Sequence, residues 1–341
     1  MYFRDHAVTQ HPGLHDRALQ TRYRHLDRHR ARYLNGLNSM TLLLHPGFHK
    51  TATSWLQSTV FAEKRLFRSL MTHEEIDDLL VRPHDFWFDA EQASADISAL
   101  RSDPKPGVVD VISSEILSGN ILLGSRDSAQ LAKRLAATCD EAKVLLTVRA
   151  QKPMARSIYQ QYVKRGGRLG IEEFLRFAPE PGYFWFDPAT LEFHKVAEAY
   201  AAYFGRENVM VLPQELLVSN RPQYLRLMFD FVGLEESVAE HELAKAPASS
   251  ISPPLSGAPL LRIANSIGQS PFNPRSRSRI APLGKLIERV GYRWTLGEAK
   301  AKQRADAALD AELSNRFGKS NAILQRFCPV DLKKLRYEMD D

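Results

Sequence analysis

The stretch that decides the fold is residues 42–56, which read LLLHPGFHKTATSWL. An apolar run leads into a turn that contains Gly47, then into Lys50 and Thr51, and then into a segment with helical character. A helix that begins directly after a strand points its free backbone N–H groups and the positive end of its dipole at that junction. Lys50 adds a mobile cation, and the hydroxyls of Thr51, Thr53 and Ser54 add donors. The stretch therefore predicts a binding site for an anionic group.

Short apolar runs alternate with longer helical stretches from residue 40 onward, which is typical of βαβ units. The runs are continuous rather than alternating, as in strands covered on both faces. We expect helices at about 51–62 and 153–165, helical character over 300–327, and strands at about 41–45, 108–113, 143–148 and 208–212. The predicted fold class is α/β, with three layers (α/β/α) around a central, mainly parallel sheet.

The nucleotide P-loop is the first interpretation to test, and its pattern is G-x-x-x-x-G-K-[ST]. With Lys50 and Thr51 aligned on the last two positions, His49 and Leu44 stand where the two glycines belong. The missing glycines disfavour a P-loop kinase that uses Mg-ATP, which we keep as an alternative.

The stretch resembles instead the 5′-phosphosulfate loop of the sulfotransferases that use 3′-phosphoadenosine 5′-phosphosulfate (PAPS). That loop follows a strand and reads Pro-x-x-x-Lys-[Ser/Thr]-Gly-Thr-[Thr/Ser]-Trp, and the residues in register here are Pro46, Lys50, Thr51, Thr53, Ser54 and Trp55. Ala52 replaces the commoner glycine, and Gly47 lies in the turn. The resemblance implies a P-loop NTPase-like sulfotransferase fold with PAPS as co-substrate.

A second segment supports the same resemblance. Residues 144–149, VLLTVR, form an apolar run that ends in Arg149, and Ser157 follows eight residues later. This spacing looks like the family's 3′-phosphate motif, although Pro153 stands two residues later than usual. An arginine at a strand end and a serine two turns into the next helix can hold one phosphate from two sides. The resemblance covers residues 40 to about 215 well and the rest loosely.

The resemblance also implies a mechanism, an in-line displacement at sulfur by an acceptor oxygen. Lys50 is then placed to neutralise charge on the leaving phosphate. A base for the acceptor hydroxyl is needed as well. Glu115, at the end of a predicted strand, is the candidate, with His49 as the runner-up; Glu115 is equally well explained as a helix-capping carboxylate. His45 is expected to be structural. No metal is required.

Trp55 stands where relatives stack the adenine ring, and its alternative explanation is a core tryptophan. The tetrapeptide Phe-Trp-Phe-Asp occurs at 86–89 and again at 184–187. Each copy is interpreted either as an aromatic platform that stacks on an acceptor or as an anchor that holds its loop to the core. Arginines 275, 277 and 279 could close over a phosphate or bind an anionic acceptor, or belong to a solvated loop. The acceptor is expected to be a small-molecule or carbohydrate hydroxyl, with a carbohydrate or glycolipid preferred.

Composition limits the remaining possibilities. The chain has 341 residues, 44% hydrophobic and 25% charged, which is ordinary for a globular protein. Two cysteines, Cys139 and Cys328, are too few for a cysteine-based metal site and suit a reducing compartment. No apolar run approaches the length of about 20 residues that a membrane-spanning helix needs, and no signal peptide is evident. A cytoplasmic location is expected, and the oligomeric state is left open.

The positive charge is concentrated at the N-terminus. The net charge is +6, and residues 1–39 hold seven arginines and three aspartates, so they contribute +4 of it. We interpret 1–39 as a basic, flexible extension, for which translation from an upstream start is one explanation, and 40–341 as the sulfotransferase domain. A basic arm that binds nucleic acid is the alternative, although no nucleic-acid partner is expected.

Overall fold

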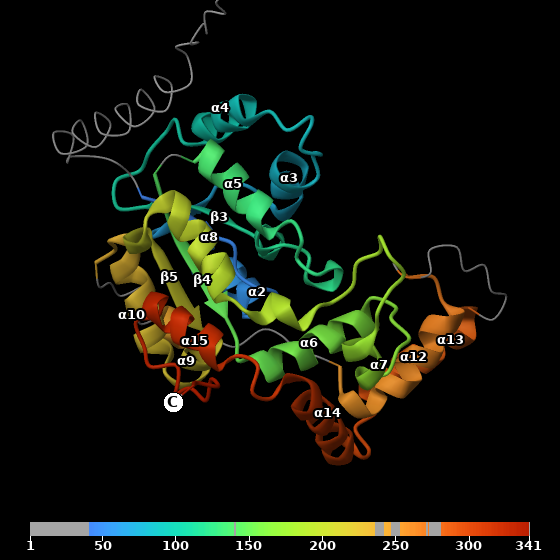
Figure 1. Ribbon diagram of the computed structural model, residues 1–341. Helices are drawn as coiled ribbons and strands as arrows, with labels where there is room; N and C mark the ends of the chain where they lie inside the picture. Colours follow the sequence, from blue (N-terminus) through green and yellow to red (C-terminus); the bar gives the residue numbers. More distant parts are fainter. Residues whose placement is uncertain are drawn as a thin grey trace, which may run out of the picture. The chain divides into compact units, whose positions relative to one another are not determined.

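The central sheet has five strands, all parallel, in the computed structural model, which describes residues 41–139, 141–235, 242–246, 253–270, 272 and 281–340. The strands are β1 (Leu42–His45), β2 (Phe67–Ser69), β3 (Val109–Ser113), β4 (Ala142–Val148) and β5 (Val209–Pro213). Their order is β2-β3-β1-β4-β5 (Figure 1). The predicted α/β class is confirmed, and the four predicted strands end within a residue of the observed ones.

Strand β1 lies at the centre, where Leu44 pairs with Ile112 of β3 on one side and with Val144 of β4 on the other. From β1 the chain builds β2 and β3 on one side, then crosses to β4 and β5. Open α/β sheets bind ligands beyond the carboxyl ends of the strands where the order reverses in this way. The loop after β1 and the residue after β4, Arg149, both lie at that edge.

Helices fill most of the chain between and after the strands. They are α2 (Thr53–Trp55), α3 (His73–Ile76), α4 (Ala90–Leu100), α5 (Ser128–Thr138), α6 (Gln151–Lys164), α7 (Ile171–Arg176), α8 (His194–Phe204), α9 (Gln214–Ser219), α10 (Arg221–Val232), α12 (Ala258–Ile267), α13 (Ala281–Arg293), α14 (Glu298–Leu313) and α15 (Gly318–Leu324). The predicted helix at 51–62 is α2 with the π-helical turn η1 (Leu56–Val60), and the one at 153–165 is α6. Residues 300–327 are helical as expected, but they divide into α14, α15 and the 3₁₀ turn η8 (Gln325–Phe327).

Successive residues of β1, β3, β4 and β5 point into two different hydrophobic cores. Leu44 and Leu146 belong to a core that includes residues of α5, α6 and α8. Leu43 and Leu145 belong to a second core, with residues of α2, η1 and α10. Helices therefore cover both faces of the sheet, which confirms the three-layer arrangement and explains why the strands are apolar throughout.

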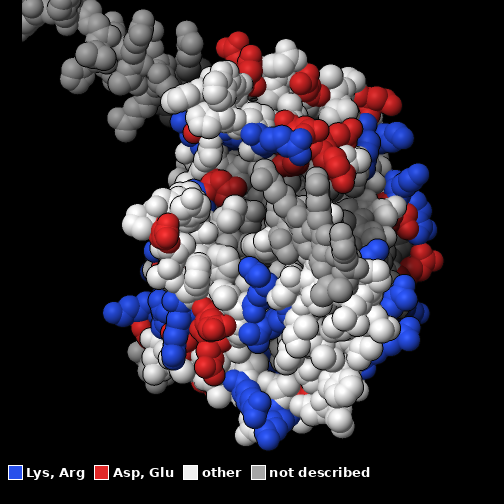
Figure 2. Space-filling view, turned by 90° about the vertical axis from the view of Figure 1, so that its right-hand side faces the viewer, with Lys and Arg blue, Asp and Glu red and all other residues white. Residues whose placement is uncertain are grey.

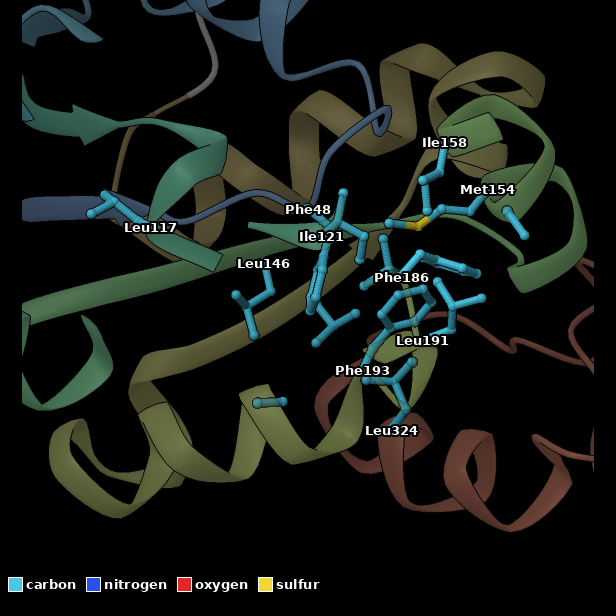
Figure 3. Packing of buried hydrophobic residues seen from close by; sticks show 14 of the residues in the cluster. Phe48, Leu117, Ile121, Leu146, Met154, Ile158, Phe186, Leu191, Phe193 and Leu324 are labelled. Carbon is cyan, nitrogen blue, oxygen red and sulfur yellow. The ribbon is translucent and has the colours of Figure 1, made fainter. Parts of the chain in front are cut away.

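The loop after β1 is anchored in the first core. The ring of Phe48 is buried, and its centroid lies 4.7 Å from that of Phe193. Figure 3 shows Phe48 beside Ile121, with Phe186 and Leu191 nearby. A loop held by a buried aromatic side chain has a fixed position above the sheet, and this is where a binding site needs rigidity.

Two features of the sequence prediction need correction or restriction. The edge strand β2 was not predicted; it has three residues, and of these only Phe67 is buried. The Pro- and Ser-rich stretch 246–259, expected as a linker or loop, is described at Ala246 and from residue 253, where η7 (Leu255–Gly257) and the start of α12 are helical. The described part of the chain has no helix that is both long and apolar enough to cross a membrane.

Candidate phosphate-binding cleft and acceptor pocket

The loop between β1 and α2 has an unusual backbone. Lys50 (φ 65°) and Ala52 (φ 66°) are both in the left-handed region, although neither is glycine. Ala52 is the N-cap of α2, and no side chain caps the helix there. The first N–H groups of a helix lack intrahelical partners, so this uncapped start leaves donors for a bound anion. An αL backbone favours glycine, which is the residue that the sulfotransferase loop resembled by this stretch commonly has at the position of Ala52.

Thr51 holds the loop together rather than pointing outward. Its side chain is 1% exposed, its hydroxyl donates to the Phe48 carbonyl at 2.5 Å, and it lies 2.7 Å from the hydroxyl of Thr147 in β4. The Phe48 N–H donates to the Thr147 carbonyl at 3.1 Å. The loop is therefore tied to β4 by side chain and backbone, and Thr51 is left to offer a ligand its backbone N–H.

Gly47 is required by close packing. A Cβ at this position would lie 2.6 Å from Thr147 Oγ1 and 2.7 Å from His45 Nε2, closer than real Cβ contacts allow. His45 itself is fully buried; its Nδ1 lies 2.8 Å from Ser113 Oγ and its Nε2 lies 3.3 Å from Thr147 Oγ1. Burial lowers the pKa of His45 to about 3, so the ring is neutral and joins β1 to β3 and β4. The structural role expected for His45 matches this environment.

Arg149 and Ser157 lie at the junction of β4 and α6, as the second motif requires. Arg149 forms no ion pair with a carboxylate of the described residues, although the charge of Glu215 acts on it, and Ser157 is 3% exposed. Other cations of the same helix are paired: Lys152 with Asp310 (2.6 Å) and Arg156 with Asp306 (2.8 Å). Pro153 lies in the first turn of α6, where no backbone donor is needed, so its late position does not disturb the helix. Unlike Lys152 and Arg156, Arg149 is thus left without an ion-pair partner among the described residues.

Lys50 is also free of ion pairs within the described part of the chain. Burial, and then the positive charges of Lys164 and Arg149, lower the pKa of Lys50. Burial, in spite of the opposing effect of Glu215, also lowers the pKa of Arg149. Because the charge of Arg149 acts on Lys50, the two cations lie near each other, with Glu115 and Glu215 as the carboxylates whose charges act on them. Figure 2 shows Lys and Arg side chains gathered just below the middle of one face of the molecule.

A pocket of about 420 Å³ opens beside Lys50 and brings the three predicted catalytic residues together. His49, Lys50 and Glu115 line one part of it. The rest is mainly apolar, with Asn120, Gln161 and Arg165 among the lining residues Ile116, Ile121, Leu122, Leu123, Ile158 and Phe272. A space of this size and lining suits an organic acceptor.

Glu115 and His49 differ in how they are held. Glu115 is the first residue of the 3₁₀ turn η3 (Glu115–Ser118), whose N-cap is Ser114, with the Ser114 hydroxyl accepting from the Ile116 N–H. The carboxylate of Glu115 is therefore not needed as the cap and lines the pocket. His49 Nε2 lies 3.2 Å from the Gly119 carbonyl, so Nε2 donates and Nδ1 is the basic nitrogen. Burial is the main cause that lowers the pKa of His49, against the opposing effect of Glu115.

His73 is a pocket residue that sequence reasoning missed. It begins α3, its Nδ1 lies 2.8 Å from Ser114 Oγ, and it lines the same pocket as Glu115. No motif marks it in the sequence, because a single histidine outside the two motifs gives no spacing signal. Its contact with Ser114 ties the start of α3 to the residue that precedes Glu115.

The remaining motif residues lie at the start of α2. Ser54 is exposed, Thr53 is 5% exposed, and Trp55 is 5% exposed within the second core. The guanidinium of Arg221 lies 5.0 Å from the centroid of the Trp55 ring. Because Trp55 is almost fully buried and Arg221 lies over its ring, stacking of adenine on it stays a prediction beside the core alternative.

The two Phe-Trp-Phe-Asp segments share one local role. Asp89 accepts from the Gln92 N–H (2.9 Å) to cap α4, and Asp187 accepts from the Ala189 N–H (2.8 Å) to cap η5 (Pro188–Leu191). In the second segment Phe186 is buried and stacked on Phe174, so this segment anchors its loop. In the first segment, Phe86 is 86% exposed, so its ring does not anchor the loop to the core.

Several expectations concern residues beyond those described. Residues 1–39 and arginines 275, 277 and 279 lie outside the described residues, so the basic extension and the arginine cluster stay predictions. Among the described residues, no group of three or more His, Cys, Asp or Glu side chains is arranged to hold a metal ion. Cys139 and Cys328 are buried thiols.

No protein-family model and no curated protein matches the sequence. Among solved structures the chain is similar to the sulfotransferase from Alicyclobacillus acidocaldarius (16% identity, covering 75% of this chain and 97% of that one, TM-score 0.42). It is also similar to mouse sulfotransferase SULT7A1 complexed with PAP, 3′-phosphoadenosine 5′-phosphate (12% identity, covering 84% of this chain and 88% of that one, TM-score 0.39). A third similar structure is the sulfotransferase domain from the curacin biosynthetic pathway (12% identity, covering 62% of this chain and 80% of that one, TM-score 0.39). These are sulfotransferases, the family that the two sequence motifs resemble. Since the similarities are distant, the functional assignment has to rest on the residues of the site.

Proposed function

We propose that this protein is a PAPS-dependent sulfotransferase that moves a sulfuryl group to an acceptor hydroxyl. The observation that carries the proposal is a pair of cations that form no ion pair with any described residue, Lys50 in the loop after β1 and Arg149 directly after the adjacent strand β4, with Ser157 on the helix that follows Arg149. A ligand with a 5′-phosphosulfate and a 3′-phosphate presents two anionic groups to these two positions. A nucleotide with phosphates at one end would leave one of the cations unpaired.

Each residue has a distinct task in this reaction. Lys50 and the N–H groups at the start of α2 would neutralise the 5′-phosphate as the bond from its oxygen to sulfur breaks. Arg149 and Ser157 would hold the 3′-phosphate. The acceptor oxygen forms the new bond to sulfur, and Glu115 takes its proton, with His49 Nδ1 as the alternative base. The displacement as proposed requires no metal ion.

The acceptor would bind in the pocket that His49, Lys50 and Glu115 share. Its apolar residues, among them Ile121, Leu122 and Ile158, suit an acceptor with an apolar part. Of the two acceptor classes expected from the sequence, this lining favours a glycolipid over a bare carbohydrate. The cytoplasmic location expected from the sequence stays a prediction.

Thermal unfolding of the full chain with 3′-phosphoadenosine 5′-phosphate (PAP), AMP or Mg-ATP tests the proposal. A ligand at 100 times its dissociation constant adds about 2.7 kcal/mol of stability, which is a measurable shift of the midpoint. We expect a shift with PAP in the absence of metal and a much smaller one with AMP at the same concentration. A shift with Mg-ATP alone would favour the kinase instead, and no shift with any of the three would contradict the proposal.

A further inference from the structure

Helix α13 exposes a stripe of apolar side chains that nothing in the described structure covers. Leu283, Leu286 and Val290 are 49%, 57% and 42% exposed. They stand at positions i, i+3 and i+7, so they share one face of the helix. Just beyond the helix, Trp294 and Leu296 are 42% and 77% exposed. The stripe is therefore a continuous apolar surface and not a set of scattered side chains.

A row of cations runs beside this stripe. Lys285, Arg289 and Arg293 recur every fourth residue and so lie along an adjacent line of the helix surface. Each is exposed, and none forms an ion pair with any described residue. Glu288, the one acidic residue of α13, stands three residues from Lys285, so it lies on the other side of this row from the apolar stripe. The helix thus presents apolar and cationic surface together.

The intramolecular packing of α13 uses a different face. Gly284 and Gly291 are buried, and a Cβ on them would lie 3.2 Å from Ile267 Cγ2 and 2.9 Å from Leu261 Cδ2, respectively. These glycines let α13 approach α12 closely, and the two helices lie side by side in Figure 1. The exposed stripe is thus additional to the apolar surface that the fold already uses.

The α12–α13 pair is fixed to the part of the molecule that carries the pocket. The Asn265 side chain in α12 donates to the carbonyls of Val163 and Gly167, both at 2.8 Å, at the end of α6. That end of α6 and the residue after it supply Gln161 and Arg165 to the pocket lining. A surface that engaged α13 would therefore engage the region next to the pocket.

We propose that α13 docks the protein on a lipid bilayer that contains anionic lipids. A helix lies in a membrane interface when its apolar face enters the acyl boundary and its Lys and Arg side chains meet anionic headgroups. Tryptophan is favoured at that depth, and Trp294 stands at the end of the stripe. The cationic row favours this occupant over a second copy of the chain, which would bring the same three cations to the contact. The proposal does not depend on the sulfotransferase activity.

Co-sedimentation of the full chain with vesicles tests it. We expect binding to vesicles of 70% phosphatidylcholine and 30% phosphatidylglycerol and much weaker binding to pure phosphatidylcholine. The triple variant L283S/L286S/V290S and the double variant K285E/R289E should each lose at least about tenfold in partitioning. The matched controls are F86S/W87S, which removes exposed apolar side chains elsewhere, and K105E/K133E, which reverses two other exposed lysines.

Each variant is first shown to be folded by its thermal unfolding midpoint, which should stay near that of the wild type because the changed side chains are exposed. Vesicle binding that survives in both α13 variants would overturn the proposal and assign binding elsewhere, for example to the basic N-terminus. Absence of binding to either vesicle would overturn it as well. A dimer that only the α13 variants dissociate, without vesicle binding, would assign the stripe to self-association instead.

Discussion

The hydroxyl of Thr51 lies 2.7 Å from the hydroxyl of Thr147, although the two residues are 96 positions apart in the sequence. Thr51 belongs to the loop that carries Lys50, and Thr147 lies two residues before Arg149 in the strand beside it. The contact joins the two predicted phosphate motifs directly, so the distance between their cations is set by the sheet and not by a flexible connection. Thr147 also lies 3.3 Å from His45, which extends the same network to β1.

Replacement of Thr147 by valine should therefore affect both stability and nucleotide binding. The change leaves the buried Thr51 and His45 groups with one partner fewer, which costs about 1–3 kcal/mol of unfolding free energy. PAP should bind more weakly than to the wild type because the loop is less well positioned. Thr138→Val, which removes a buried hydroxyl within α5, is the control and should lower stability alone. Unchanged PAP affinity in Thr147→Val would contradict the coupling. Denaturant titration and calorimetry provide the two measurements.

Gly47→Ala should be destabilising for a steric reason. The new Cβ would meet Thr147 Oγ1 and His45 Nε2 at less than 3 Å, and both of these groups are fixed by hydrogen bonds. Overpacking of this kind costs about 1–3 kcal/mol. Gly268→Ala is the matched control, since its Cβ would be 3.5 Å from the nearest atom. Equal unfolding midpoints in denaturant for the two variants would show that the loop tolerates a side chain at 47.

The identity of the base can be tested with two variants in the same pocket. Loss of a general base lowers kcat by about 10²- to 10⁴-fold. We expect this loss in Glu115→Gln, with PAP affinity unchanged, because the carboxylate faces the acceptor pocket and caps no helix. His49→Asn should lower kcat less, because the contact of His49 Nε2 with the Gly119 carbonyl gives this histidine a positioning role in the loop rather than the role of the base. The opposite order of kcat values, measured once an acceptor is known, would make His49 the base.

The pH dependence should show the environment of Lys50. Its ammonium must be protonated to stabilise the leaving phosphate, and burial lowers its pKa below the ordinary 10.5. Activity should therefore fall as the pH rises, with the midpoint of this limb below 10.5. In Lys50→Arg the guanidinium stays charged over the whole range, so the residual activity should lose this limb. A limb that is identical in both enzymes would belong to another group.

Much of the fold followed from local patterns. Strands β1, β3, β4 and β5 were predicted closely, because a parallel sheet covered on both faces needs continuous apolar runs such as 42–44 and 144–146. Strand β2 was missed because its three residues are too few for a pattern, and its place depends on pairing with β3. The helical region over 300–327 was recognised, but its division at Ser314 reflects tertiary contacts.

The site was predictable where its residues follow one another in the chain. Lys50, Arg149 and Ser157 stand at fixed spacings within strand–helix junctions, and these spacings are visible in the sequence. His73 and Phe272 were not predicted, because only the folded chain brings them to the pocket. The inward direction of the Thr51 hydroxyl was also missed, since sequence spacing does not say which donor of a residue faces the ligand.

The measurement that tests the central claim most directly is the calorimetric affinity of PAP and of AMP for the wild type, Arg149→Ala and Lys50→Ala. PAP should bind the wild type at least about tenfold more tightly than AMP, since a charge-assisted contact contributes about 1.5–3 kcal/mol. Arg149→Ala should abolish this preference. Lys50→Ala should retain it and lose turnover with PAPS. Arg156→Ala, whose cation is already paired with Asp306, is the control and should behave as the wild type. Equal affinities for PAP and AMP in the wild type, or a preference for PAP that survives in Arg149→Ala, would contradict the two-phosphate cleft.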